Sequence, residues 1–314
     1  MLPHNAPQHH RPGSMDLKQI EYFVKVAELG SFSRAALALD VAQPALSKQV
    51  RALEVEMRQS LLTRTGRGAV LTESGKVLFN HGVGILHQLE LAREEMTRVR
   101  GTLAGRVAIG LPPTIGRVMA AQLYREARQR MPEASIAITE GSSYGLLESL
   151  RTGRLDVAFI YDVSSSPDIA ATVIATQELL LVGRATQPGA QEDPVSLAEL
   201  AELPLVLPTR PNTLRLLIEG ELAGIGRQPK VAVEVDGVPT ILDLVGDGAG
   251  CTVLTQRAIE TSGRAGLYSL RRIQPALHSS LTVATSAHRP VTLTQNALLQ
   301  LAVSLARTLL VKPA

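Results

Sequence analysis

Amide, hydroxyl and cationic side chains recur at helical spacing near the amino end of the chain. Gln43, Ser47 and Arg51 are four residues apart, with Pro44 and Lys48 beside them. At about 3.6 residues per turn they share one polar, cationic helix face. Such a face can lie in a DNA major groove, where Gln pairs with adenine, Lys or Arg with guanine, and Ser with phosphate or base. An isolated polar stripe is more often only the solvated face of a surface helix. The neighbouring elements must therefore distinguish between a solvated face and a DNA-binding face.

The residues around this face predict two helices joined by a tight turn. Gly30 ends one helix and Ser31 caps the next. Pro44 stands in the first turn of the second helix, where its missing N–H costs nothing. The opposite face of that helix carries three residues that must be buried: Leu46, Val50 and Leu53. A preceding helix that begins at Asp16 supplies their apolar partners. This helix-turn-helix pattern favours the DNA-binding interpretation.

A short hairpin is expected directly after the second helix. Gly66 and Gly68 allow a tight turn between the apolar pairs at 61–62 and 70–71. Arg64 and Arg67 project cations from it. Beside a helix-turn-helix, such a hairpin is typical of a wing that contacts phosphate or the minor groove.

A long helix is predicted from Thr72 to about Arg100. Its apolar residues recur every seven residues or at alternating spacings of four and three, which is the pattern of a coiled-coil seam: Leu78, Ile85, Leu89, Ala92, Met96 and Val99. A small winged domain cannot bury so long a seam. The pattern therefore predicts a partner helix from a second subunit, which would present the DNA-contacting helices in pairs.

Composition limits the class of protein. A chain of 314 residues, 45% of them hydrophobic, can bury the cores of two or three domains. No apolar run reaches the ~18 residues of a membrane span. The formal charge of +3 permits DNA binding through a local patch without arguing for it. Cys251 is the single cysteine, which excludes an internal disulfide framework and fits a reducing cytosol. Residues 1–14 are interpreted as a disordered tail or tag.

Beyond Gly101 strands and helices alternate, which predicts an α/β architecture, and the first three of these strands form a βαβ pattern that implies a parallel sheet. Strands are expected at 106–111, 135–140, 156–160, 178–183, 204–207, 231–235, 251–254 and 280–285. Helices are expected at 114–130, 144–152, 213–223, 240–246 and 294–310. Two α/β lobes linked by crossing strands would leave a cleft between them, where small ligands usually bind.

Hydroxyl and proline residues follow three of the expected strands and open the helices behind them. The candidate effector-binding residues are Pro113, Thr114, Ser142, Ser143 and Tyr161 in the first lobe and Pro208, Thr209 and Asn212 in the second. Each hydroxyl is more often only a helix cap, but three such caps that converge on one cleft favour a small anionic ligand. Arg210 offers a cation for a carboxylate, although exposure is the commoner fate of an arginine.

The sequence resembles the LysR-type transcriptional regulators over residues 15–310. The resemblance is carried by QIEYFVKVAELGSFSRAALAL, AQPALSKQVRALE, LLTRTGRG and LTESG. It implies that four residues face DNA, Gln43, Pro44, Ser47 and Lys48, and that Ser33 and Arg34 help to position the backbone. Many members carry arginine at the position of Lys48. Lysine keeps the charge there and loses the bidentate geometry that suits guanine.

The resemblance also implies the domain organisation. A winged helix-turn-helix domain would span 15–72 and a linker and dimerisation helix 73–101. An α/β effector-binding domain would span 102–314, with two Rossmann-like lobes similar to type II periplasmic binding proteins. Lobe I would comprise 102–161 and 269–314, and lobe II 162–268. The implied partners are double-stranded DNA, further copies of the chain in a dimer or dimer of dimers, RNA polymerase and a small effector. No cofactor, metal or catalytic residue is expected, and the protein would act in the cytoplasm at the nucleoid.

Three alternatives stay open at this point. Within the family, IGLPPTIGRV, GRLDVAFIYD and PLVLPTRPNTLRLLIE resemble the subgroup of nitrogen assimilation control regulators. A member that needs no coinducer would keep the hydroxyl set only as inherited architecture. An extracytoplasmic solute-binding protein would share the two lobes, but it would have a secretion signal and no winged domain. An enzyme would need an acid/base pair at the strand ends, for which Asp156, Asp162 and Asp236 are candidates that no spacing singles out.

Overall fold

A computed structural model describes residues 15–65, 68–97, 103–163, 166–185, 193–289 and 291–310, and within these ranges it leaves out the side chains of 93–97. The chain forms two compact units. The N-terminal unit comprises residues 1–93 with 152–154, and the C-terminal unit comprises 94–151 and 155–314. Each unit has its own hydrophobic core.

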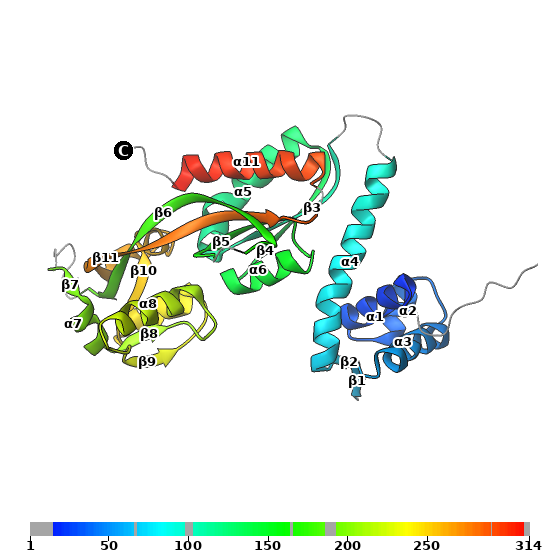
Figure 1. The fold of residues 1–314 in the computed structure, drawn as a ribbon, viewed down its shortest axis with the longest axis horizontal. Coiled ribbons are helices and arrows are strands. Elements are labelled where there is room, and N and C mark those ends of the chain that lie inside the picture. Colours follow the sequence, from blue (N-terminus) through cyan, green and yellow to red (C-terminus); the bar gives the residue numbers. More distant parts are fainter. Residues whose placement is uncertain are drawn as a thin grey trace, which may run out of the picture. The chain divides into compact units, whose positions relative to one another are not determined.

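Three short helices open the N-terminal unit (Figure 1): α1 (Leu17–Leu29), α2 (Phe32–Ala38) and α3 (Gln43–Met57). Asp16 and Gln19 form a capping box at the start of α1, and Gly30 ends this helix in the left-handed conformation with φ 60°. The Ser31 side chain accepts a hydrogen bond from the Arg34 backbone N–H at 3.4 Å. The caps predicted at these positions are confirmed, because each satisfies a helix-end group that has no partner within its helix.

The core of the N-terminal unit lies between α1, α2 and α3. Leu46, Val50 and Leu53 of α3 are at most 1% exposed, as predicted. They pack with Phe23 of α1 and Ala35 of α2 in one cluster. Burial of large apolar side chains is worth about 1.5–3 kcal/mol each, so the apolar face of α3 fixes which side of this helix remains outside.

The predicted hairpin is confirmed. Strands β1 (Leu62–Thr65) and β2 (Gly68–Leu71) pair antiparallel, with Leu62 opposite Leu71. Gly68 has φ 138° and its Cα faces the Gly30 carbonyl oxygen so closely that a Cβ atom would lie 2.2 Å from it. Only glycine suits both this conformation and this approach. Gly66 lies outside the described residues.

Helix α4 (Glu73–Thr97) begins where it was predicted. The Thr72 hydroxyl accepts a hydrogen bond from the Gly75 N–H at 3.0 Å, which caps the helix. Gly82 allows a close approach to α1, because a Cβ there would lie 3.0 Å from the side chains of Ile20 and Val24. The expected end near Arg100 falls outside the described residues.

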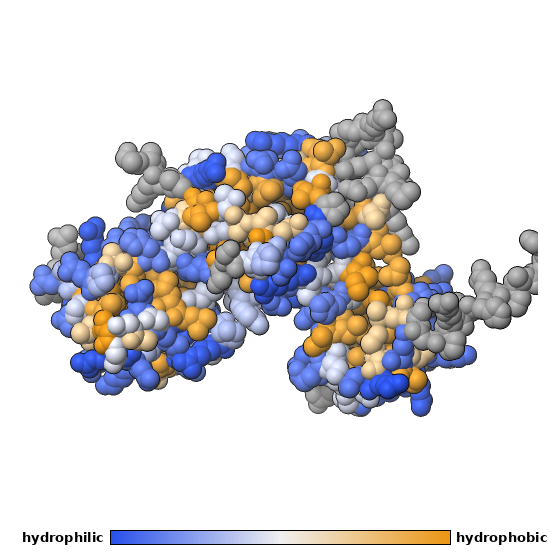
Figure 2. All heavy atoms as spheres, viewed as in Figure 1, coloured by the Kyte–Doolittle hydropathy of each residue, from blue (hydrophilic) through white to orange (hydrophobic). Residues whose placement is uncertain are grey.

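The predicted seam of α4 divides between two environments. Leu78 packs against the core of its own unit. Ile85 of the seam, by contrast, is 37% exposed, and Val77, which was not assigned to the seam, is 61% exposed. Apolar side chains accordingly gather over α4 on the face seen in Figure 2. The side chains of Met96 and Val99, which were also assigned to the seam, lie outside the described residues.

The C-terminal unit is built on a mixed sheet in the order β10-β6-β11-β5-β3-β4. The strands are β3 (Ala104–Leu111), β4 (Glu133–Glu140), β5 (Val157–Tyr161), β6 (Ile169–Arg184), β10 (Thr252–Thr255) and β11 (Tyr268–Ser286). Strands β3, β4 and β5 are parallel, as predicted, but β11 pairs antiparallel with both β5 and β6. The parallel sheet predicted from the first three strands is therefore confirmed, and β11 is antiparallel because the chain returns to the first lobe in the opposite direction.

Helices cover both faces of the sheet in the first lobe. Figure 1 shows α5 (Pro113–Arg130) and α11 (Leu293–Leu310) together on one face and α6 (Ser143–Arg151) on the other. The first pair shares a core with Val107, Ile109 and Phe159. Helix α6 packs on Ala108, Ala158 and Ile160, which alternate with the first set along the same strands.

The second lobe contains several short elements. They are β7 (Val195–Ser196), α7 (Leu197–Glu202), β8 (Leu205–Leu207), α8 (Thr213–Gly224), β9 (Val231–Glu234), α9 (Val238–Gly246), α10 (Gln256–Glu260) and the 3-10 turn Ala265–Leu267. Helices α8 and α9 agree with the prediction within two residues. Helices α7 and α10 were not predicted, because six and five residues carry too little periodicity to be recognised.

Strands β6 and β11 run through both lobes. Ile174, Leu281 and Val283 belong to the core of the first lobe, whereas Leu179 and Leu277 belong to the core of the second. The strands expected at 178–183 and 280–285 are thus parts of strands of 16 and 19 residues. The predicted lobe boundaries at 162 and 268 stay predictions, and the cores give a physical reason to draw them within β6 and β11.

Neither a membrane-crossing helix nor a cluster of metal-binding side chains occurs in the described residues. No helix in them combines the length and hydropathy needed to cross a membrane. The same ranges contain no group of three or more histidine, cysteine, aspartate and glutamate side chains arranged to hold a metal ion.

We predict that Gly75→Ala destabilises the N-terminal unit. The added Cβ would lie 2.0 Å from the Leu61 carbonyl oxygen, so backbone must shift, at an expected cost of about 1–3 kcal/mol. Gly220→Ala in α8 is the matched control, because nothing lies within 4 Å of its Cβ and alanine favours a helix by up to about 1 kcal/mol. Denaturant unfolding of both variants measures the difference, and a loss that is equal in the two would contradict this account of Gly75.

Candidate nucleic-acid interface and ligand cavity

The polar face of α3 is accessible in the N-terminal unit. Pro44, Lys48 and Arg51 are exposed, and Gln43 and Ser47 are half-buried. The buried and polar faces therefore separate as the spacing predicted. The backbone at the start of α3 has no side-chain cap, and Ala42 is its N-cap residue. The first turn of α3 therefore has N–H groups without a side-chain acceptor, and the polar face of the same helix carries cations. Both features favour the binding of a polyanion.

Arg64 adopts a different position from the one predicted. Its Nη2 donates a hydrogen bond to the Ser47 hydroxyl at 2.7 Å, and its guanidinium lies 4.6 Å from the centre of the Phe32 ring. The side chain is therefore folded back onto α2 and α3 rather than extended from the hairpin. A cation–π contact and a charge-assisted hydrogen bond hold it there. Its charge adds to the polar face of α3. Arg67 lies outside the described residues.

Ser33 and Arg34 are exposed in the first turn of α2. Arg34 Nη2 donates a hydrogen bond to the Leu29 carbonyl oxygen at the end of α1. This contact ties the C-terminus of α1 to the start of α2. Any role of these two residues against a DNA backbone stays a prediction.

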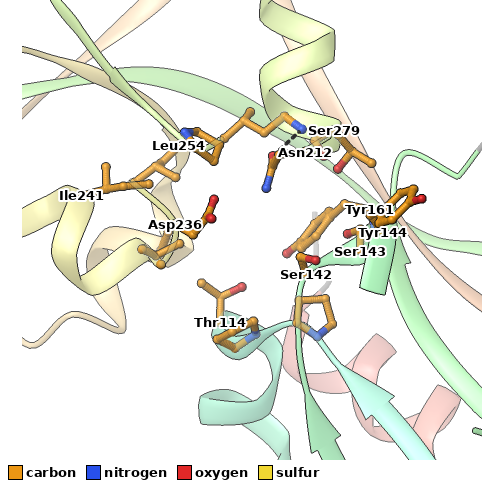
Figure 3. Close-up of a pocket in the computed structure, with 18 of the residues that line it drawn as sticks. Thr114, Ser142, Ser143, Tyr144, Tyr161, Asn212, Asp236, Ile241, Leu254 and Ser279 are labelled. Carbon is orange, nitrogen blue, oxygen red and sulfur yellow. Dashed lines mark hydrogen bonds between the residues drawn. The ribbon is translucent and has the colours of Figure 1, made fainter. Parts of the chain in front are cut away.

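A cavity of about 530 Å³ lies between the lobes of the C-terminal unit. All eight candidate effector-binding residues line it, from the start of α5 and α6, the end of β5 and the segment that follows β8: Pro113, Thr114, Ser142, Ser143, Tyr161, Pro208, Thr209 and Asn212. Figure 3 shows the polar groups of both lobes facing this space. The size is within the range of small-molecule sites. Their role in binding an effector stays a prediction.

The first lobe contributes hydroxyl groups with protons to donate. Ser142 Oγ accepts from the Gly145 N–H at 3.2 Å, and Ser143 Oγ accepts from the Tyr161 N–H at 3.0 Å. Ser143 is 9% exposed, and its own proton has no acceptor among the described residues. A serine hydroxyl can donate one bond while it accepts another. Both hydroxyls therefore accept from the protein and remain able to donate towards the cavity.

Tyr161 is a half-buried phenol on the same wall. Burial raises its pKa, and a hydrogen bond with Thr114 acts in the opposite direction without reversing the rise. Its hydroxyl lies 3.4 Å from Gln177 Oε1. The phenol is therefore neutral at physiological pH and serves as a hydrogen-bonding group rather than as an anion.

The second lobe contributes an aspartate that the sequence did not assign to the ligand site. Asp236 Oδ1 accepts hydrogen bonds from the Thr209 N–H and hydroxyl at 3.0 and 2.9 Å. Asn212 caps α8 through its oxygen, which accepts from the Leu214 N–H at 3.0 Å, so that its NH₂ group is left for the cavity. Asp236 follows a strand and precedes a helix, which is the signal used for the other candidates. Ser279, within the long strand β11, carries no such signal.

Arg210 does not offer an uncommitted cation. Its Nε and Nη2 donate to the two carboxylate oxygens of Glu219 at 3.0 and 2.7 Å. Burial alone would raise the pKa of Glu219, but hydrogen bonds from Arg210 and Arg215 outweigh it and lower the pKa. Arg215 is 4% exposed, bonds to Glu219 and donates to the Pro208 carbonyl oxygen at 3.3 Å. Together they clamp the segment that carries Thr209 and Asn212.

The other acidic candidates have structural partners. Asp156 accepts from the Ala108 N–H and from Gln295, both at 2.7 Å. Asp162 accepts from the Ser279 hydroxyl at 2.6 Å and from the Ser280 N–H at 2.7 Å. Asp162 and Asp236 both line the cavity, but Asp156 does not. The three therefore do not form one catalytic group.

Comparison with known families accounts for both units. Residues 17–76 match the family described as bacterial regulatory helix-turn-helix protein, lysR family, and residues 100–307 match the LysR substrate binding domain. The nitrogen assimilation regulatory protein nac of Klebsiella aerogenes is 35% identical over 87% of this chain and 89% of its own length. The HTH-type transcriptional regulator BbuR of Bordetella bronchiseptica is 31% identical over 83% of this chain and 79% of its own length.

Two solved structures have the same fold. A full-length OxyR variant from Pseudomonas aeruginosa superimposes with a TM-score of 0.67 at 23% identity, over 96% of this chain and 97% of that one. Full-length CbnR complexed with its target DNA gives a TM-score of 0.62 at 24% identity, over 94% and 99% of the two chains. At these identities the likeness shows the fold alone. The two relatives in sequence are named as regulators and not as enzymes.

We predict unequal effects from the two arginines that bind Glu219. Arg215→Met removes a buried cation from between two carboxylates and frees the Pro208 carbonyl, which should cost about 2–4 kcal/mol. Arg210→Ala removes a partner that is 66% exposed, and should cost less than about 1 kcal/mol. Denaturant unfolding of the full chain checks the order, and equal losses would show that Arg215 does not clamp the cavity wall.

Proposed function

The chain belongs to the LysR family of DNA-binding transcriptional regulators, and from that premise we propose how it reads its operator and senses its effector. Helix α3 enters the major groove and the β1–β2 hairpin lies against the adjacent backbone. A ligand in the cavity of the C-terminal unit changes the spacing of paired DNA-binding units and thereby the bend of the DNA. The observation that carries the proposal is one amphipathic helix whose polar face stays accessible while its apolar face fills the core.

On the DNA side, the residues divide by chemistry. Gln43 has the paired donor and acceptor that suit an adenine edge. Lys48 and Arg51 supply cations for guanine or phosphate, and Ser47 and Arg64 form a bonded pair that suits one phosphate. Ser33, Arg34 and Pro44 complete the contact surface as the family resemblance implies. Arg67 is assigned to the hairpin side of the same interface from the sequence alone.

Self-association is proposed through α4. Val77 and Ile85 leave an apolar strip on the outer side of a helix of 25 residues. A two-fold pair of such helices would bury both strips and present two copies of α3 to successive turns of the duplex. A dimer of dimers, contact with RNA polymerase and action in the cytoplasm at the nucleoid follow as parts of this proposal.

The effector is proposed to be small and to carry a carboxylate or similar anion. Thr114, Ser142 and Ser143 would donate to it beside the amino ends of α5 and α6. Arg117 of α5 donates to the Thr261 carbonyl oxygen of the second lobe at 3.2 Å, so the lobes already touch across the cleft. A ligand that adds contacts on both sides would favour a closed arrangement.

A regulator without a coinducer is the second candidate. The internal bonds of Ser142, Thr209 and Asn212 favour it, since these groups cap helices and bind Asp236 without any ligand. A switch through an intrachain disulfide is excluded for these 314 residues by their single cysteine, Cys251.

We predict that Gln43→Ala weakens discrimination between operator and scrambled DNA by about tenfold, because a lost pair of base contacts costs about 1–3 kcal/mol. Arg51→Ala is the comparison, and it should weaken binding to both sequences to a similar extent if Arg51 contacts phosphate. Fluorescence anisotropy at fixed salt measures both. If Gln43→Ala lowers the two affinities equally, Gln43 does not read a base.

We predict that Thr114→Val leaves basal DNA binding intact and reduces the response to an inducer by about tenfold. Valine has a similar shape but cannot donate a hydrogen bond, and a bond to a charged ligand is worth about 1.5–3 kcal/mol. A promoter–reporter strain measures the response. An unchanged induction ratio would remove Thr114 from the sensor, and a promoter that is regulated without any inducer would favour the second candidate.

A further inference from the structure

We propose that the cavity recognises an amino group as well as a carboxylate, with Asp236 as the residue that binds the cationic end. The effector class would then be α-amino acids or close zwitterionic analogues. This inference rests on the proposed effector function and narrows it, because an anion alone would satisfy only one of the two cavity walls.

The Asp236 carboxylate is only partly engaged by the protein. Oδ1 accepts from the Thr209 N–H at 3.0 Å, and the single proton of the Thr209 hydroxyl is shared between Oδ1 at 2.9 Å and Oδ2 at 2.7 Å. Among the described residues it forms no ion pair. A carboxylate has about four acceptor positions, so lone pairs remain on Oδ2. Figure 3 shows this carboxylate turned towards the open space, across from Thr114 and Ser142.

Carboxylates outnumber cations in the lining of the cavity. Three carboxylates line it, those of Glu140, Asp162 and Asp236, against one guanidinium, that of Arg210. Arg210 is neutralised by a bidentate pair with Glu219. Asp162 is held by Ser279 and Ser280. Among the residues of the second lobe that line the cavity, Asp236 therefore carries the charge without an ion-pair partner, which favours a cationic group beside it; Arg257 of α10, outside the lining, acts on the pKa of Tyr161 on the opposite wall.

The opposite wall of the cavity, in the first lobe, offers hydrogen-bond donors. Ser143 is nine-tenths buried and holds a proton for which the described residues provide no acceptor. Ser142, in the same turn, also has its oxygen engaged and its proton free. Donors of this kind match a carboxylate. The first lobe thus offers hydroxyl donors, the second lobe offers the Asp236 acceptor beside the Asn212 amide, and a small zwitterion could bind to both lobes within a cavity of about 530 Å³.

Asp236 could also serve only to accept the hydrogen bonds of Thr209, and the test must distinguish this structural role from ligand binding. The Thr209 N–H and hydroxyl need an acceptor, but they do not need a charge. Asparagine would accept the two bonds that reach Oδ1 through its own oxygen, but it replaces Oδ2 by an NH₂ donor and lacks the negative charge. Asp236→Asn therefore removes recognition of an ammonium group while it keeps the segment after β8 in position.

The experiment titrates the full chain by calorimetry with the twenty standard L-α-amino acids, each beside its deaminated carboxylic acid. We expect at least one amino acid to bind about tenfold or more tightly than its deaminated partner, as a charge-assisted bond requires. In Asp236→Asn this preference should fall below about threefold, whereas Asp247→Asn, an exposed charge of the same lobe outside the cavity lining, should keep it.

Each of the other outcomes contradicts either the amino-group inference alone or both this inference and the proposed effector function. If a carboxylic acid binds as tightly as its amino acid, or if Asp236→Asn keeps the preference, the amino-group inference is wrong and the effector function stands. If no compound of either series binds at millimolar concentration, both the inference and the effector function fail, and regulation without a coinducer is favoured.

Discussion

The paired strands β6 and β11 are the constraint on which the C-terminal unit depends. They are hydrogen-bonded from Tyr268 opposite Arg184 to Ser286 opposite Ile169, with irregularities after Arg272 and Leu281. Backbone groups in a buried sheet cannot be left without partners, so the two strands must pass through both lobes together. Each lobe then packs its own helices onto a part of the same ribbon, and the lobes can change their spacing only by bending it. The cavity exists because this ribbon joins the lobes on one side and leaves the other open.

A comparable constraint acts on a smaller scale in the N-terminal unit. Burial of Leu46, Val50 and Leu53 determines the rotation of α3, and this rotation exposes the face that carries Gln43, Lys48 and Arg51. The hairpin is then fixed to the same core through Leu62 and Ala69. Arg64 consequently lies close enough to bind Ser47. Core packing thus positions polar side chains that do not themselves contribute to the core.

The sequence predicted the features that depend on local chemistry. Caps such as Asp16 and Ser31, the buried face of α3 and most of the strands follow from spacing and residue type within one element. Features that depend on distant contacts were missed. The position of Arg64 requires Phe32 and Ser47, and Arg215 requires Glu219, Glu234 and the Pro208 carbonyl. The length of β6 and β11 was underestimated because polar residues interrupt their apolar pattern where the strands leave the cores.

The opposite character of the two cavity walls bears on how a signal can arise. A ligand shifts a conformational equilibrium only by the difference between its affinities for the two states. A ligand bound by the hydroxyls of Ser142 and Ser143 alone would contact one lobe and would bind equally at any lobe spacing. A contact with Asp236 adds the second lobe, which makes affinity depend on closure. Asp236 is bonded to Thr209, and Arg215 of α8 holds the neighbouring Pro208 carbonyl. A ligand that binds Asp236 would therefore move the second lobe and not only one side chain. Recognition of the ligand and movement of the lobes are, in this arrangement, consequences of the same bonds.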